Sequence, residues 1–118
     1  MGVVAKLLRN DPGGWGLQQF DDGFISTAPV ASFPAGNSPV GAVDMAGNVW
    51  EWVEDCFHDT YDGAPADGSA WTAGTCQRRV MRGGSWFNKP VDAAGRDEND
   101  LAFRYHSFGF RVVRSLAP

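Results

Sequence analysis

The sequence predicts one small domain of short strands and long structured loops. The chain has 118 residues, enough for a single modest core. It contains 15 Gly, 7 Pro and 5 Trp, and Gly and Pro in helix interiors cost about 1 and 3 kcal/mol per residue. The composition therefore excludes a helical bundle. No apolar run of about 18 residues is present, so we expect no membrane span.

Three segments have strand patterns. Residues 49–53 alternate, with two tryptophans on one face. Residues 79–82 run into Gly83 and Gly84, and paired glycines allow a kink or a close backbone approach. Residues 108–113 are apolar and rich in β-branched side chains. We therefore expect three strands in this order.

The segments between these strands, 54–78 and 87–107, are rich in turn-forming residues and are expected to be loops. Cys56 and Cys76 flank the acidic first loop, and their spacing is not that of a zinc site. Two alternatives remain open. A disulfide would contribute about 3 kcal/mol by closing the loop, whereas a reducing cytosol would keep two buried thiols.

The charge pattern limits the partners. The formal net charge is −4, which argues against nucleic acid as a general partner. The first nine residues lack the cleavage site of a secretory signal, so the cytoplasm is the default location. His58 and His106 stand in polar loops without the pattern of a nucleophilic triad, and we expect neither to be catalytic.

Asp44 and Glu51 lie seven residues apart, with a glycine turn between them. Two such carboxylates and the loop carbonyls have the oxygen chemistry that calcium prefers. The alternative is that Asp44 caps a turn and Glu51 pairs with an arginine. Spacing alone favours this alternative.

Three motifs in this order resemble the formylglycine-generating enzyme (sulfatase-modifying factor) family. They read DMAGNVWEW at 44–52, RVMRGGSW at 79–86 and GFR at 109–111. The resemblance covers roughly residues 20–114, whereas residues 1–19 match poorly. Complete family domains are considerably longer, so residues 20–118 resemble the C-terminal part of one.

The resemblance implies an α+β fold of C-type-lectin-like architecture, with little regular structure. We expect a small twisted antiparallel sheet with long loops. A partial domain would leave the apolar side of its sheet exposed. The chain is therefore expected to associate with itself or with the missing N-terminal half.

The resemblance also implies calcium. It implies two sites. The first is half represented here, by the Asp22 side chain and the Phe24 carbonyl, because its remaining ligands belong to an upstream segment that does not align with residues 1–19. The second comprises the side chains of Asp44 and Glu51 and the backbone carbonyls of Gly47 and Val49.

The oxidase members of the family carry a cysteine pair shortly after the Gly-Gly-Ser motif, and these thiolates bind copper(I). The corresponding stretch here, residues 87–97, contains no cysteine, and Cys56 and Cys76 precede the motif. We therefore expect no copper, and we favour a non-catalytic domain over an oxidase that acts on sulfatase cysteines. A structural fragment of a larger multidomain protein is a further alternative.

The same fold without these cysteines serves as a binding scaffold, for example in the bacterial variable proteins of diversity-generating retroelements. Residues 87–108 occupy the place of their diversified segment. We expect this segment to bind a protein or a small molecule, and an ordinary solvated loop is the alternative. The candidate ligand-binding residues are Asn88, Lys89, Arg96, Asn99, Arg104, Tyr105 and His106.

Overall fold

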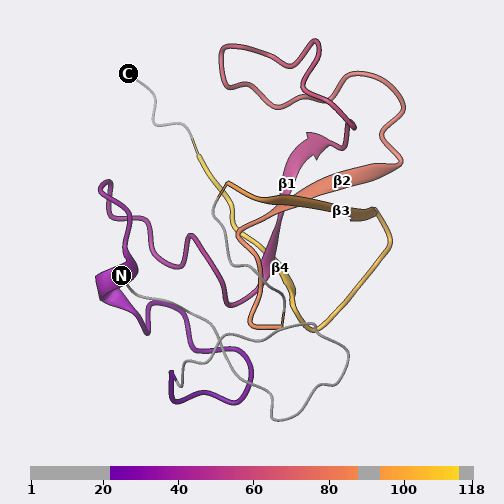
Figure 1. The fold of residues 1–118 in the computed structure, drawn as a ribbon. Helices are drawn as coiled ribbons and strands as arrows, with labels where there is room; N and C mark the ends of the chain where they lie inside the picture. Colours follow the sequence, from indigo (N-terminus) through magenta and orange to yellow (C-terminus); the bar gives the residue numbers. More distant parts are fainter. Residues whose placement is uncertain (1–21, 88–93, 115–118) are drawn as a thin grey trace.

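A computed structural model describes residues 22–87 and 94–114 (Figure 1). The elements in order are η1 (Pro34–Gly36), β1 (Trp50–Cys56), β2 (Arg78–Arg82), β3 (Arg96–Asp100) and β4 (Phe108–Phe110). The four strands form one sheet in the order β3-β2-β1-β4. Within the described ranges, no helix has the length and apolar character needed to cross a membrane.

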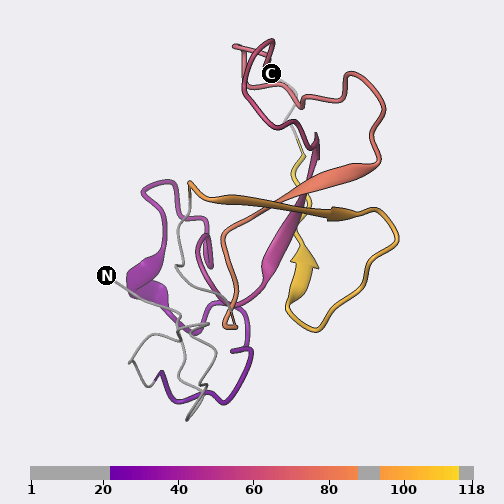
Figure 2. The same cartoon turned by 45° about the vertical axis from the view of Figure 1, so that its right-hand side comes forward.

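The sheet is small and twisted, as expected, and it is mixed rather than wholly antiparallel. β1 pairs antiparallel with β2 and parallel with β4, and β2 pairs antiparallel with β3. The parallel pair arises because residues 101–107 carry the chain from β3, at one edge, to the opposite edge beside β1. Figures 1 and 2 show β3 crossing the direction of β1 steeply. The sheet therefore brings the 101–107 loop close to the central strand.

The strands expected at 49–53, 79–82 and 108–113 correspond to β1, β2 and β4, although β4 ends at Phe110. β3 lies where a loop was expected. Its sequence, RDEND, has low strand propensity. It pairs along its whole length with β2, and its edge position allows polar side chains to remain partly solvated. Backbone pairing therefore overrides local propensity here.

The core of the described residues is small. Its buried apolar members are Ala28, Trp50, Cys56, Val80 and Met81. Val80 and Met81 are consecutive, so both faces of β2 are covered at this point. The chain then turns at Gly83 and Gly84, which have φ values of 88° and 72°, and the Gly83 carbonyl accepts a hydrogen bond of 2.7 Å from the Gly47 amide.

The Asn48 side chain, just before β1, holds the upstream segment at Ala28. Its carboxamide accepts from the Ala28 amide at 3.0 Å and donates to the Ala28 carbonyl at 3.1 Å. On the other side of β1, Gly109 in β4 lies so close that an added Cβ would stand 2.9 Å from Cγ2 of Val49. Only glycine allows this approach between the two parallel strands.

Candidate functional site

A groove lies between the 101–107 loop, β1 and β4. Its volume is about 560 Å³. The lining residues are Trp52, Arg79, Leu101, Phe103, Arg104, Tyr105, Phe108, Gly109 and Phe110. The loop reaches this place because it connects β3 to the strand on the far side of β1. We call this feature the aromatic groove.

Phe108 is the centre of the aromatic groove. Its ring packs edge-on against Trp52, with the centroids 5.7 Å apart. Phe103 and Tyr105 lie at 5.7 and 5.8 Å from the same ring. The register of β1 and β4 places Phe110 beside Trp52. The β3–β4 connection thus adds two aromatic side chains to those of the two strands.

These side chains are exposed although they are apolar. Phe103 and Tyr105 are 44% and 47% exposed, and Phe110 is 76% exposed. Contiguous exposed apolar surface on a small domain usually marks a contact site. The groove is therefore the strongest candidate for binding among the described residues.

Two arginines stand at the aromatic groove. Arg104 donates to the carbonyls of Leu101 and Phe103 at 3.2 and 3.0 Å, and Arg79 donates to the carbonyl of Glu54. Within residues 22–87 and 94–114, neither guanidinium forms an ion pair with a carboxylate. The groove therefore combines an apolar floor with positive charge that the described carboxylates do not neutralise.

The structure divides the predicted ligand-binding residues. Arg104 and Tyr105 line the aromatic groove, and His106 packs against Trp86 and Tyr105 with centroids at 5.4 and 4.1 Å. Two further predicted ligand-binding residues, Asn88 and Lys89, lie outside the described residues.

Arg96 and Asn99 lie on β3, away from the groove lining. The Arg96 guanidinium is held over the rings of Phe57 and Tyr61, at 5.0 and 4.2 Å from their centroids. The Asn99 carboxamide accepts a hydrogen bond of 3.0 Å from the amide of Asp100. Sequence reasoning missed Trp52, Phe103 and Phe108 as lining residues, and their aromatic character was the available signal.

The predicted ligands of the second calcium site come together. Asp44, Gly47, Val49 and Glu51 line one cavity of about 310 Å³, together with Arg111. The chain bends here through left-handed residues: φ is 52° at Asp44 and 84° at Gly47. Strain of this kind in a non-glycine residue persists only where the surroundings impose it. We call residues 43–51, which end in the first two residues of β1, the 43–51 loop.

Arg111 binds the 43–51 loop from β4's side of the sheet. Its Nε donates to Glu51 at 2.5 Å, and an Nη atom donates to the other carboxylate oxygen. Further hydrogen bonds of 2.9 Å reach the carbonyls of Val43 and Asp44. The hydrogen bond with Glu51 raises the pKa of Arg111, so the guanidinium stays charged.

These contacts match the alternative in which Glu51 pairs with an arginine, and Asp44 accepts a turn-closing hydrogen bond of 2.8 Å from the Ala31 amide. They do not remove the calcium prediction. The donor types, carboxylates and carbonyls, fit a hard cation. No three His, Cys, Asp or Glu side chains converge on one point in the part of the chain that is described. A cation here would therefore depend on backbone carbonyls and share Glu51 with Arg111.

At the predicted first site, the Asp22 carboxylate accepts a hydrogen bond of 3.0 Å from the Phe24 amide. This is a local turn, and the upstream segment that would complete the site lies outside the described residues. The two residues stay a predicted half-site.

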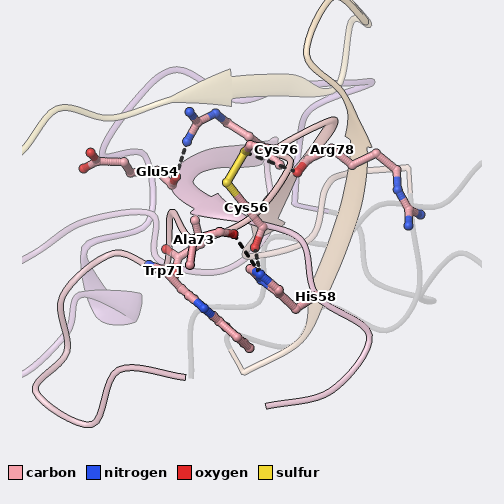
Figure 3. The surroundings of a disulfide bond; sticks show 9 residues. Glu54, Cys56, His58, Trp71, Ala73, Cys76 and Arg78 are labelled. Atoms are coloured by element: carbon pink, nitrogen blue, oxygen red, sulfur yellow. Dashed lines mark hydrogen bonds between the residues drawn. A yellow bond between two sulfur atoms is a disulfide. The ribbon is translucent and has the colours of Figure 1, made fainter. Parts of the chain in front are cut away.

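Cys56 and Cys76 form a disulfide at the ends of the first long loop (Figure 3). The His58 ring lies against two carbonyls, with Nδ1 3.0 Å from that of Cys56 and Nε2 3.2 Å from that of Ala73. It stacks on Trp71 with centroids 3.6 Å apart. Both cysteines are therefore part of a structural assembly.

The comparisons with known proteins agree with these motifs. The model of the sulfatase-modifying factor enzyme 1-like domain matches residues 8–116. The chain belongs to this family. The residues of the aromatic groove and of the 43–51 loop lie within the matched range.

Three curated relatives are informative. The formylglycine-generating enzyme of Streptomyces coelicolor is 45% identical over 99 residues, which are 79% of this chain and 31% of that protein. The serine/threonine-protein kinase pkn1 of Chlamydia caviae is 38% identical over 76% of this chain and 15% of its own length. The inactive Cα-formylglycine-generating enzyme 2 of Mus musculus is 38% identical over 70% of this chain and 20% of its own length.

The structure of PvdO from Pseudomonas aeruginosa has a TM-score of 0.70 and 43% identity to this chain. The similarity covers 75% of this chain and 34% of PvdO. The chain thus spans at most about a third of each of these relatives.

Proposed function

We propose that the chain is a non-catalytic protein-recognition module of the sulfatase-modifying factor family. The aromatic groove would bind a segment of a partner protein that carries apolar side chains next to a carboxylate. The exposed rings around Phe108 carry this proposal, because large aromatic surfaces and arginines dominate the energetics of protein interfaces.

The charge of the groove supports a carboxylate in the partner. Arg79 and Arg104 donate to backbone carbonyls, and no described carboxylate pairs with either. A guanidinium can hold a carboxylate through two parallel hydrogen bonds. An acidic residue beside the apolar anchor would therefore be favoured over a neutral one.

The distribution of cysteine supports a non-catalytic role. The chain has two cysteines, and both are in the disulfide at the end of β1. Residues 87–97, where the oxidase cysteines would stand, contain none. One relative at 38% identity carries the word inactive in its name, which supports a non-catalytic member of this family.

The test is selection of random linear peptides from a display library on the purified chain. We expect enrichment of an aromatic or aliphatic residue next to Asp or Glu. Phe103→Ala should weaken the selected peptides at least tenfold, and Arg104→Gln should remove the preference for the acidic residue. Matched controls are Ile25→Ala, which is exposed outside the groove, and Arg114→Gln. Peptides that bind the Phe103→Ala variant as tightly as the unaltered chain would contradict the proposal.

We further propose that the 43–51 loop binds calcium and that calcium stabilises the domain. The four predicted ligands share one cavity. A ligand at 100 times its dissociation constant adds about 2.7 kcal/mol to the free energy of unfolding. Thermal melting in millimolar calcium and in EGTA should therefore differ by several degrees. Glu51→Gln should abolish the difference, whereas Glu54→Gln, an exposed carboxylate on the same strand, should keep it.

A formylglycine-generating oxidase is the second candidate, because of the 45% identity to the Streptomyces enzyme. Incubation with copper(I), oxygen and a cysteine-containing sulfatase peptide tests it. We expect no aldehyde by mass spectrometry, since residues 87–108 supply no thiolate.

The variable-protein interpretation stays a prediction. Sequences of natural copies would test it, because diversification predicts differences confined to residues 87–108.

A further inference from the structure

We infer that Arg111 and a divalent cation compete for the Glu51 carboxylate. The guanidinium holds the 43–51 loop closed, and a cation that enters the cavity takes over carboxylate oxygens now bound to Arg111. This inference rests on the calcium binding proposed above, and it adds a residue that no ligand pattern in the sequence identified.

The contacts of Arg111 support the exchange. Both oxygens of Glu51 accept hydrogen bonds from the one guanidinium. Two further N–H groups donate to the carbonyls of Val43 and Asp44 at 2.9 Å. The positively charged guanidinium of Arg111 is therefore bound by two carboxylate oxygens and two backbone carbonyls of the 43–51 loop. This is the oxygen environment that a hard metal cation also requires.

A metal ion bound in this cavity would lie close to the charged guanidinium of Arg111. Arg111, Asp44 and Glu51 line it together with the carbonyl-bearing residues Gly47 and Val49. Two carboxylates and one guanidinium leave a net charge of −1 at the loop. Because like charges repel at short range, a metal ion binds more weakly beside Arg111 than beside a neutral side chain.

The exchange predicts a coupling that can be measured in two directions. Arg111 should lower the affinity for calcium, and calcium should replace the stabilisation that Arg111 provides. By linkage, loss of Arg111 should lower the free energy of unfolding more in EGTA than in saturating calcium. The difference between the two losses should equal the gain in the free energy of calcium binding.

The experiment is calorimetric titration of the purified chain with calcium chloride, with thermal melting of the same samples in calcium and in EGTA. The variants are Arg111→Gln, Arg111→Lys and Arg114→Gln. We expect Arg111→Gln to bind calcium about tenfold more tightly than the unaltered chain. Arg111→Lys, which keeps the charge but not the fork of donors, should lie between the two. Arg114→Gln removes the same charge three residues away and should change the affinity less than twofold.

The outcomes separate this inference from the calcium proposal. If the unaltered chain binds calcium and Arg111→Gln binds it equally or more weakly, the exchange is wrong and the calcium proposal stands. If neither binds up to 10-millimolar calcium, both are wrong. If Arg111→Gln does not fold in EGTA, an affinity of Arg111→Lys equal to that of the unaltered chain overturns the exchange, and a higher affinity supports it.

Discussion

The two loops that follow β1 and β3 are built in opposite ways. Residues 57–77 are closed by the disulfide, and the amide of Trp71 donates to the Asp55 carboxylate at 3.1 Å. Residues 101–107 have no disulfide, and Arg104 donates to carbonyls of its own loop. In the first loop Trp71 stacks on His58, whereas in the second the rings of Phe103 and Tyr105 line the exposed aromatic groove. The first loop is thus held by a disulfide and a polar contact, and the second presents an exposed apolar surface.

The largest expected effect is on the fixed loop. Cys76→Ser should lower the free energy of unfolding by about 3 kcal/mol, because the open loop gains conformational entropy when the chain unfolds. Chemical denaturation measures this loss. The unaltered chain in a reducing agent should coincide with the variant. Equal midpoints for variant and oxidised chain would show that the disulfide does not hold this region.

A smaller effect is expected from the polar contact of the same loop. Asp55→Ala removes the acceptor of the Trp71 amide, and such a loss costs about 1 kcal/mol. Asp59→Ala is the control, since Asp59 is an exposed carboxylate three residues after the end of β1. Thermal melting should separate the two variants, and identical melting curves would contradict the role of Asp55.

The exposed loop and β4 should behave differently. Phe110→Ser should change the free energy of unfolding by no more than about 0.5 kcal/mol, because the side chain is 76% exposed. It should nevertheless abolish binding of the selected peptides, measured by fluorescence anisotropy. A large loss of stability would instead mean that Phe110 belongs to the core.

The smallest effect concerns a turn within the fixed loop. Asp67 accepts hydrogen bonds from the amide and the hydroxyl of Ser69 at 3.0 and 2.7 Å, and these lower the pKa of Asp67 below its ordinary 3.8. The ionised Asp67 carboxylate therefore contributes to the stability of the folded chain above the ordinary pKa. This contribution is lost as the pH falls through the lowered pKa of the folded state. NMR titration should show a midpoint below 3.8. In Ser69→Ala the midpoint should rise, and an unchanged midpoint would contradict this cause.

The sequence predicted the features that depend on local pattern. The alternation at 49–53 located β1. The glycine pair after residue 82 located the end of β2 and the turn that follows it. β3 was missed because its pairing with β2, and not its polar sequence, makes it a strand. The parallel pairing of β4 was missed for a related reason: strand direction is set by the path of a loop.

The candidate sites show the same limit. The motif around Asp44 identified residues that do share a cavity, because they are close in the sequence. Arg111 joins them from 60 residues beyond Glu51, and spacing cannot reveal such a partner. The predicted ligand surface was divided between β3 and the aromatic groove, because β3 lies at one edge of the sheet and residues 101–107 carry the chain to the opposite edge.

The close approach at Gly109 makes β4 a shared wall. Gly109 and Phe110 line the aromatic groove on one side and the cavity of the 43–51 loop on the other. A single methyl group at position 109 would collide with Val49 and push the short strand outward. Both recesses would then change shape together, so one hydrogen atom in place of a side chain keeps two separate surfaces in register.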